Sequence, residues 1–557
     1  MKKLHTGLVA WVIIVLFNAC SQKDEINSLE EKLTFEQMKF SLTRSKDQNN
    51  PISKIDYLLN TTQVTFENGD IVTIDNATID RIENDSVNWL TSFYFNDKSS
   101  VSSFFVGQLN ISNSNIAVNP YDKNPLTAFA KIETPIKGLF KVIVHGKGDN
   151  GIAIAKTFSD YGYAHDLPIL GLYQNFANQV EFIFTNQNGV LRASKTLTLQ
   201  TEPIPVTPNI IINTNTLGTD YNGIFIVSSL RLGFDQTGEV RWCYTPESSP
   251  QFSFMRKMAN GNMLLVSPDG TSFTELTMLG QTVKKYSVPA GIHHDVIEMP
   301  SGNFLVTSNS NNGVSIEDLV VEVDRVSGSI VKSWDMNKIL DPSRKALPDS
   351  ESNDWFHMNS LFYDTTDRSI IISGRSQSAV VKIDYASGEL KWILGNPNFW
   401  NDALSKYLFN PVNSIGQPID VTNTDFWQYG QHAAQRLQNG NMLMYDNGDF
   451  RGYYDNQSVP QKSYSRAVEY AIDEQARTIK LVWTFDNNKT IFTAYTGFVQ
   501  QLPSSRLIAY MFGPLGNSNA PKIVEIDNNN QIQFDANVNL GAVYYRASKL
   551  DLYQGIN

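Results

Sequence analysis

The sequence has few cysteines, no long apolar segment and no concentration of positive charge. Two cysteines among 557 residues exclude a disulfide-rich scaffold and a cysteine-based zinc site. The N-terminal apolar run, LVAWVIIVLF, is shorter than the roughly 20 residues that a helix needs to span a bilayer. The net charge is −11 and no stripe of lysine and arginine is present, so a nucleic-acid partner is not expected.

The N-terminus carries the features of an export signal. Two lysines precede the apolar run, which ends at Cys20 behind the small residue Ala19. Residues 1–20 therefore resemble a bacterial lipoprotein signal, with Cys20 as the lipidated first residue of the mature chain; a plain secretory signal is the alternative. The lipoprotein interpretation predicts a cell-envelope protein, on the periplasmic face or the outer-membrane surface. Cys243 then remains alone, so no intramolecular disulfide can form, and its W-C-Y context favours a buried hydrophobic role.

Composition and strand spacing predict an all-β protein of several domains. Hydrophobic residues make up 41% of the chain and aromatic residues 11%, as in folded proteins, and 557 residues exceed one ordinary core. Residues 21–110 indicate a polar tether followed by a small β-rich region. Residues 111–205 contain runs such as LFKVIVHG and VEFIFTN at the spacing of an Ig-like β-sandwich. The stretch TEPIPVTPN then indicates a boundary, and residues 206–557 form the last domain.

A repeat in residues 206–557 predicts a six-bladed β-propeller. An apolar residue is followed three and four residues later by a turn pair and then by a β-rich run. The frame begins at Met258, Met299, Leu437, Leu502 and Leu552, and at Phe362 with the longer turn DTTDRS. Six such units correspond to the first strands of six four-stranded blades. The chain ends just after the sixth of them. We therefore expect the C-terminal YYRASKLDLYQG to complete the blade that starts near residue 222 and to close the ring.

Three of the seven histidines share one register in this repeat. Counting back eight residues from the turn glycine leads to His432 in one blade and to His294 in another. The blade with the longer turn has His357 at the equivalent place. First strands line the axis of a propeller, so these imidazoles should meet at one mouth of the channel. Because strand side chains alternate, we expect His293 to face away from His294.

Hairpin pairing adds an arginine and two amides to this group. Around the DTTDRS turn, paired residues place Arg375 opposite His357, with Asn359 two residues further along the same side. Similar pairing places Asn447 opposite His432, where we expect it to bind the substrate. Three imidazoles could hold zinc or copper, but the adjacent guanidinium disfavours a dication and favours a tetrahedral oxyanion. We therefore expect no metal and no cofactor, but an anion beside a nucleophilic or acid–base imidazole.

A long insertion, residues 396–430, ends directly before His432. It is far longer than an ordinary loop between strands, which indicates a function. It contains seven aromatic residues, which we expect to close over the mouth and to bind a planar organic group. The alternative is that these aromatic side chains only pack the insertion onto the propeller.

Several ordered motifs resemble the bacterial arylsulfate sulfotransferases. They are HHDVIEMPSGNFLV, DWFHMNSLFYD with SGRSQSAVVKIDYASGELKWILGNP, QHAAQRLQNGNMLMYDNGD and, in the sandwich region, HDLPILGLY. The resemblance covers residues 111–557 and implies a sandwich followed by a six-bladed catalytic propeller. It also implies transfer of a sulfuryl group from an aryl sulfate ester to a phenol, without a nucleotide sulfate donor. The region before residue 111 has no recognised counterpart in that family.

The resemblance also implies roles for the residues of the histidine group. His432 would be the nucleophile and would form a transient sulfohistidine in a ping-pong reaction. His357, Asn359 and Arg375 would hold the sulfate oxygens, and a histidine of HHD would assist, for which the register selects His294. Two other functions stay open: an aryl sulfatase-like hydrolase on the same site, or a non-catalytic surface propeller that binds an anionic or aromatic ligand. Whether the chain forms a homodimer also stays open.

Overall fold

The structure is a computed structural model, and its description covers most of the chain after residue 33. The described ranges are 34–47, 49–218, 223–245, 254–310, 315–344, 347–348, 353–422, 424–451, 463–511, 521–539 and 544–556. The expected lipoprotein signal and Cys20 lie outside these ranges. Within them, no helix is long and apolar enough to cross a membrane. The chain divides into two compact units, Met1–Val106 and Gly107–Asn557, which are described separately.

The described part of the first unit contains one α-helix and two three-stranded antiparallel sheets. Its elements are α1 (Phe35–Asp47), β1 (Ile52–Tyr57), β2 (Thr61–Phe66), β3 (Ile71–Asp75), β4 (Ile79–Asp85), β5 (Leu90–Phe95) and β6 (Ser100–Phe104). Strands β2, β3 and β5 alternate between buried and more exposed residues, which is the pattern of a sheet with one face on the core. Met38 and Leu42 of α1 pack in the same core as Val64 and Phe93, so the helix covers that face.

The second unit begins with a β-sandwich, as the strand spacing predicted. Its strands are β7 (Ile116–Val118), β8 (Thr127–Val144), β9 (Ile154–Thr157), β10 (Gly162–Leu170), β11 (Ala177–Thr185) and β12 (Leu191–Gln200). The long strand β8 pairs with β7 and β10 through its first part and with β9 and β11 through its last part. It thereby belongs to both groups of strands. Phe140, Phe182 and Phe184 are buried in the sandwich.

In the described residues, the remaining strands form six sheets, each with a core of four antiparallel strands, and this confirms the six-bladed propeller. Blade one contains β14 (Gly223–Val227), β15 (Leu232–Phe234), β16 (Val240–Cys243) and β38 (Ala547–Asp551); blade two contains β17 (Met255–Lys257), β18 (Met263–Val266), β19 (Ser272–Leu276) and β20 (Thr282–Ser287). Blade three contains β21 (Ile292–Glu298), β22 (Phe304–Ser308), β23 (Leu319–Val323) and β24 (Ile330–Asp335). Blade four contains β25 (Met358–Asp364), β26 (Ser369–Gly374), β27 (Ala379–Asp384) and β28 (Leu390–Gly395).

The last two blades each carry one additional strand at the edge. Blade five contains β29 (Asn410–Pro411), β30 (His432–Arg436), β31 (Met442–Asp446), β32 (Arg466–Asp473) and β33 (Thr478–Phe485). Blade six contains β13 (Asn209–Asn215), β34 (Phe498–Gln501), β35 (Ser505–Tyr510), β36 (Lys522–Asp527) and β37 (Ile532–Asn539). Two short helices, α2 (Met336–Ile339) and α3 (Asp402–Ser405), lie in connections between blades.

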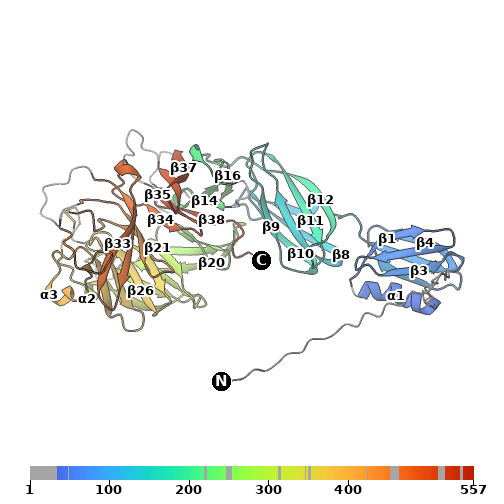
Figure 1. Ribbon diagram of the computed structural model, residues 1–557, viewed down its shortest axis with the longest axis horizontal. Helices are drawn as coiled ribbons and strands as arrows, with labels where there is room; N and C mark the ends of the chain where they lie inside the picture. The colour runs from blue at the N-terminus through green and yellow to red at the C-terminus, as the bar shows by residue number, and fades with distance from the viewer. Residues whose placement is uncertain are drawn as a thin grey trace, which may run out of the picture. The chain divides into compact units, whose positions relative to one another are not determined.

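The C-terminal strand closes the ring, as predicted from the repeat. Strand β38 pairs antiparallel with β14, with Phe225 opposite Lys549. Figure 1 shows β38 in red beside β14 in green, so the C-terminal strand completes the blade that begins with β14. Closure in this way removes the open edge that a linear array of blades would leave.

A carboxylate on the third strand explains the Gly-Asn pair of the repeat. The turn glycines Gly261, Gly302 and Gly440 have φ between +85° and +87°, a conformation that side chains rarely adopt. The next residue is an asparagine, whose Nδ2 donates to a glutamate of its own blade. The pairs are Asn262 with Glu275, Asn303 with Glu322 and Asn441 with Glu469. The turn is thereby bound to the third strand, and this satisfies a buried charge in each blade.

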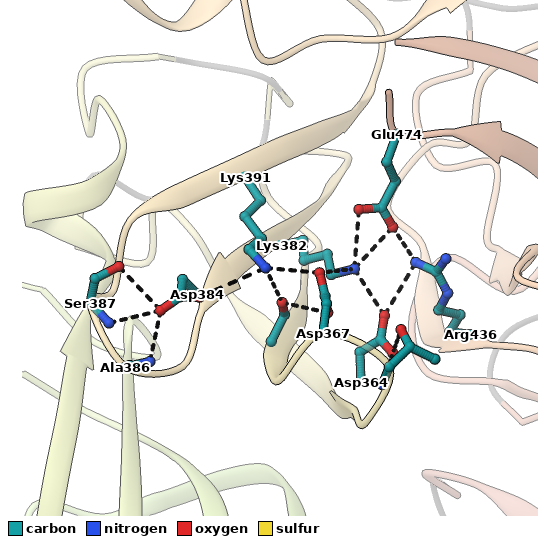
Figure 2. Close-up of polar contacts among 11 residues, drawn as sticks. Asp364, Asp367, Lys382, Asp384, Ala386, Ser387, Lys391, Arg436 and Glu474 are labelled. Carbon is teal, nitrogen blue, oxygen red and sulfur yellow. Dashed lines mark hydrogen bonds and ion pairs between the residues drawn. The ribbon is translucent and has the colours of Figure 1, made fainter. Parts of the chain in front are cut away.

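Blades four and five are joined by a network of ion pairs around a buried lysine (Figure 2). Lys382 is 1% exposed, and its Nζ lies 2.9 Å from Asp364, 3.0 Å from Asp367 and 2.9 Å from Glu474. Arg436 of blade five contacts both Asp364 and Glu474. Since three carboxylates surround one buried ammonium, loss of this lysine would leave their negative charges uncompensated where the two blades meet.

Candidate active site

Four histidines, one arginine and one glutamate line a single cavity of about 590 Å³ at the propeller axis. His293 and His294 belong to β21, and His432 is the first residue of β30. His357 directly precedes β25, and Arg375 directly follows β26. The structure therefore brings together the three histidines that share a register, in one cavity with Arg375. The backbone N–H of Arg375 donates to the His357 carbonyl at 3.0 Å, which agrees with the predicted hairpin pairing.

Irregular backbone shapes the beginning of each histidine-bearing strand. The register of β21, β25 and β30 shifts just after the histidine, and His294, His357 and Ala433 have φ of 55°, 54° and 56°. A left-handed conformation at such residues costs free energy and is common at functional sites. The bulge in β21 overturns the expectation that His293 faces away from His294, because both side chains contact the same carboxylate.

That carboxylate, Glu317, contacts three imidazoles and was missed by the sequence analysis. Its oxygens lie 2.8 Å from His293 Nδ1, 2.9 Å from His294 Nε2 and 3.2 Å from His357 Nδ1. It precedes β23 outside the repeat frame, and no spacing in the sequence indicates it. Burial alone would raise the pKa of Glu317, but attraction to His294 and His357 outweighs burial and holds this pKa well below its usual range.

The pKa values of His294 and His357 are shifted in opposite directions. Burial lowers the pKa of His294, and its contact with Glu317 only partly offsets this. Burial also opposes the charged form of His357, but Glu317 together with Asp354, 2.5 Å from Nδ1, raises its pKa. Neighbouring groups with divergent pKa values are suited to act as acid and base.

Hydrogen bonds determine the tautomer of His432. Asn447 donates through Nδ2 to the carbonyls of Thr493 at 2.8 Å and Thr496 at 2.7 Å, so its Oδ1 must face the histidine. This oxygen lies 2.7 Å from His432 Nδ1, which must then carry a proton. Burial lowers the pKa of His432 well below its usual value and keeps the ring neutral. Nε2 therefore retains its lone pair, and among the described residues it has no hydrogen-bond partner.

The two asparagines have positions different from those expected of substrate-binding residues. Both N–H hydrogens of Asn447 are used by backbone carbonyls, so it has none for a sulfate oxygen, and its contact is with His432 instead. Asn359 is fully buried and is not among the residues that line the cavity. Its Nδ2 donates to the Gln431 carbonyl at 2.7 Å, because the bulge in β25 turns it toward the neighbouring blade. Asn359 thus anchors the residue before His432.

Arg375 lies at one side of the cavity and is 5% exposed. Its Nη2 forms an ion pair with Asp449 at 2.7 Å, and its guanidinium carbon lies 4.7 Å from the centre of the Tyr495 ring. These contacts fix the direction of the guanidinium. They suit it to bind an oxyanion in the cavity.

The aromatic part of the cavity wall does not come from the insertion. Phe254, Tyr495 and Tyr545 line the cavity, and the Tyr545 ring stacks on His294 with centroids 5.3 Å apart. Trp400 and Trp427 of the insertion are buried in hydrophobic cores between blades. The expectation that these aromatic side chains close over the mouth is therefore wrong. Apart from Phe399, which is 58% exposed, they pack the insertion onto the propeller because their large apolar surfaces are better buried there.

One subset of the cavity residues has the geometry of a metal site. His294, Glu317 and His357 place one ligand atom each within 4.8 Å of one another. Two imidazoles and a carboxylate could hold a divalent transition metal. The same atoms already satisfy one another through hydrogen bonds, and Arg375 lies in the same cavity wall. These three side chains therefore already form a hydrogen-bonded acid–base group without a metal ion.

Comparison with known proteins gives consistent matches along the second unit. The family model Arylsulfotransferase (ASST) matches residues 212–546, and the model Arylsulfotransferase Ig-like domain matches residues 115–202. Proteins named Arylsulfate sulfotransferase AssT are similar at 28% identity. The one from Escherichia coli O6:H1 (strain CFT073) aligns over 530 residues, 74% of this chain and 88% of its own length. The one from Lelliottia amnigena aligns over 483 residues, 67% of this chain and 80% of its own length.

One solved structure shows a weak similarity to this chain. A crystal structure of a protein of unknown function from Bacteroides caccae is 14% identical and has a TM-score of 0.37. It covers 59% of this chain and 98% of its own. A likeness at this level carries no argument about the site.

Proposed function

The chain belongs to the arylsulfotransferase family, and we propose that it transfers a sulfuryl group from an aryl sulfate ester to a phenolic acceptor through a sulfohistidine at His432. The observation that carries this proposal is the hydrogen-bond chain from the carbonyls of Thr493 and Thr496 through Asn447 to His432 Nδ1. It keeps the proton on Nδ1 and the lone pair on Nε2. A neutral imidazole with a defined tautomer is a competent nucleophile near neutral pH.

In the first half-reaction, His432 Nε2 attacks the sulfur of the donor. The N–S bond forms while the bond between sulfur and the aryl oxygen breaks, and the phenolate leaves. His357 is the proton donor for this oxygen, because its raised pKa keeps it protonated and its Nδ1 is held by Glu317 and Asp354. His357 then donates the proton on its Nε2 to the phenolate oxygen.

The second half-reaction reverses these steps with a different phenol. His357, now neutral, accepts the proton of the acceptor hydroxyl, whose oxygen attacks the sulfur. The N–S bond breaks and restores His432 with its lone pair. Arg375 binds the sulfuryl oxygens in both halves, where its charge offsets the negative charge that accumulates as the ester bond loosens. A covalent intermediate of this kind predicts ping-pong kinetics.

The remaining groups are assigned supporting roles. His294 lies between His357 and Tyr545, with ring centroids 4.8 Å and 5.3 Å away, and assists in binding the sulfuryl group. Asn447 orients His432, and Asn359 acts through Gln431 at the start of β30. The rings of Phe254, Tyr495 and Tyr545 offer contact to the aryl part of the substrates. This function needs neither a metal nor an organic cofactor.

The proposal extends to the domains and to the location of the protein. We propose that residues 206–557 carry the activity, that residues 111–205 form the Ig-like sandwich beside them, and that residues 21–110 hold the tether and the small β-rich region. Residues 1–20 would direct export, and a lipid on Cys20 would anchor the enzyme in the cell envelope. Radiolabelled palmitate in wild-type protein, and its absence after Cys20→Ala, would test the anchor.

Acceptor dependence tests the transfer reaction itself. Turnover of a chromogenic aryl sulfate should depend on an added phenol, with parallel double-reciprocal plots and formation of the new sulfate ester. Turnover that is equally fast without phenol would identify an aryl sulfatase-like hydrolase instead. Binding of an aryl sulfate without turnover, unchanged in His432→Ala, would indicate a non-catalytic binding propeller.

A further inference from the structure

A second cavity of about 320 Å³ lies between the first strands of the propeller. It is lined by residues of β17, β30, β34 and β38, and it shares no lining residue with the histidine cavity. We call it the basic chamber, because its wall contains Arg256, Lys257, Arg546 and Lys549 and not one of its lining residues is a carboxylate. We propose that the basic chamber binds a tetrahedral oxyanion, free sulfate or phosphate, at a site separate from sulfuryl transfer.

The wall between the two cavities is built from charged and aromatic groups. Asp295 forms ion pairs with Arg256 at 3.0 Å and with Arg546 at 3.1 Å. Arg546 also donates to the His294 carbonyl at 3.1 Å, and its guanidinium lies against the ring of Tyr545. His294 and Tyr545 face the histidine cavity, whereas Arg256 and Arg546 line the basic chamber. The two cavities are therefore adjacent but separate.

The basic chamber has more positive charge than its ion pairs offset. Asp295 pairs with two guanidiniums, and Glu525 pairs with Lys549. These two carboxylates offset two of the four cationic charges. A bound dianion such as sulfate or monohydrogen phosphate would offset the remaining guanidinium charge and would favour the charged form of Lys257.

Lys257 is the cation with the least compensation in this chamber. Its Nζ donates to the Leu552 carbonyl at 2.9 Å, and among the described residues no carboxylate lies within ion-pair distance of it; the Asp551 carboxylate acts on its charge only from further away. Burial lowers the pKa of this ammonium to about 7. Buried ammonium groups normally have an anionic partner, and an oxyanion in the chamber would supply one.

Two arginines of the chamber wall are not fully hydrogen-bonded. Arg546 is 4% exposed, and the Nε atoms of Arg256 and Arg546 are buried with no hydrogen-bond partner among the described residues. A buried N–H without a partner is costly, and arginine N–H groups match the oxygens of sulfate and phosphate. The chamber wall therefore combines positive charge with arginine side chains that are not fully hydrogen-bonded, which suits a tetrahedral oxyanion.

Equilibrium dialysis of the full-length protein with radiolabelled sulfate, and separately with phosphate, tests the site. The histidine cavity is first impaired by Arg375→Ala, and binding is then measured in that background. In that background we expect one anion to remain bound. Lys257→Met should weaken this binding at least tenfold, and so should Gln554→Glu, because it adds a negative charge to the chamber wall. Lys332→Met, an exposed lysine on the outer strand β24, is the matched control and should leave the affinity unchanged.

The outcomes separate this proposal from the transfer reaction. In an otherwise wild-type chain, Lys257→Met should keep its sulfuryl-transfer rate within twofold. Sulfate and phosphate affinities that are unchanged in both Lys257→Met and Gln554→Glu would overturn the proposal. Gln554 is exposed, so this variant keeps the test decisive if Lys257→Met fails to fold.

Discussion

Replacement of Glu317 by glutamine removes one charge from the centre of the histidine cavity and preserves the size of the side chain. In the wild type this carboxylate contacts His293, His294 and His357 at 2.8–3.2 Å and raises the pKa of His357. Without it, only Asp354 still opposes the effect of burial and the pKa of His357 falls, so less of the protonated imidazole is present at neutral pH. Loss of this proton donor should slow transfer about 30- to 1000-fold, equivalent to about 2–4 kcal/mol in the activation barrier.

The pH profile of kcat distinguishes this role from a merely structural one. A raised pKa keeps wild-type His357 protonated below that pKa, so activity should fall only as the pH rises through it. In Glu317→Gln this fall should move to lower pH, and the defect should shrink as the pH is decreased. Phenyl sulfate, with its poor leaving group, should be affected more than 4-nitrophenyl sulfate.

A carboxylate elsewhere in the same cavity provides the control for Glu317. Asp269→Asn changes a residue that lines the cavity but forms no ion pair with the described histidines, and it should leave the profile in place. An unmoved profile in Glu317→Gln, with equal losses for both esters, would refute the assignment of His357 as the acid.

Three further predictions concern stability and metal dependence. Lys382→Met leaves Asp364, Asp367 and Glu474 without their shared ammonium. In urea titrations it should lower the free energy of unfolding by about 3–5 kcal/mol. A loss no larger than that of Lys391→Met would show that the network contributes little. His165 is buried against Phe140 in the sandwich, and burial lowers its pKa. The Tm should therefore fall as the pH drops below the unfolded-state value of about 6.5, more steeply than in His165→Phe, and parallel pH dependences would contradict this. Prolonged dialysis against EDTA should leave transfer unchanged, whereas a loss restored by Zn²⁺ would make His294, Glu317 and His357 metal ligands.

The propeller could be predicted because its signals are local and repeated. Each blade carries the same turn frame, and the Gly-Asn pair reflects a hairpin bound to a glutamate of the third strand. In the repeat, blade one lacks one strand and the C-terminus has one strand more than its neighbours need. Pairing of β38 with blade one accounts for both. The same frame indicated that three histidines meet at the axis, since equivalent positions in a propeller converge.

The details of the site could not be predicted because they depend on irregular backbone and on contacts between blades. Strict alternation fails at His294, where a left-handed residue and a bulge turn two successive side chains toward Glu317. Glu317 itself lies outside the repeat, so only folding brings it to the histidines. Asn447 was expected to contact substrate, but two carbonyls from the connection before blade six use its N–H groups.

The central claim is that His432 carries the sulfuryl group between the two half-reactions. The direct measurement is mass spectrometry of enzyme mixed with an aryl sulfate without acceptor, followed by peptide mapping at alkaline pH. We predict one sulfuryl adduct on the peptide that contains His432, which disappears when a phenol is added, and no adduct in His432→Ala. An adduct on His294 or His357, or one that persists in His432→Ala, would contradict the account.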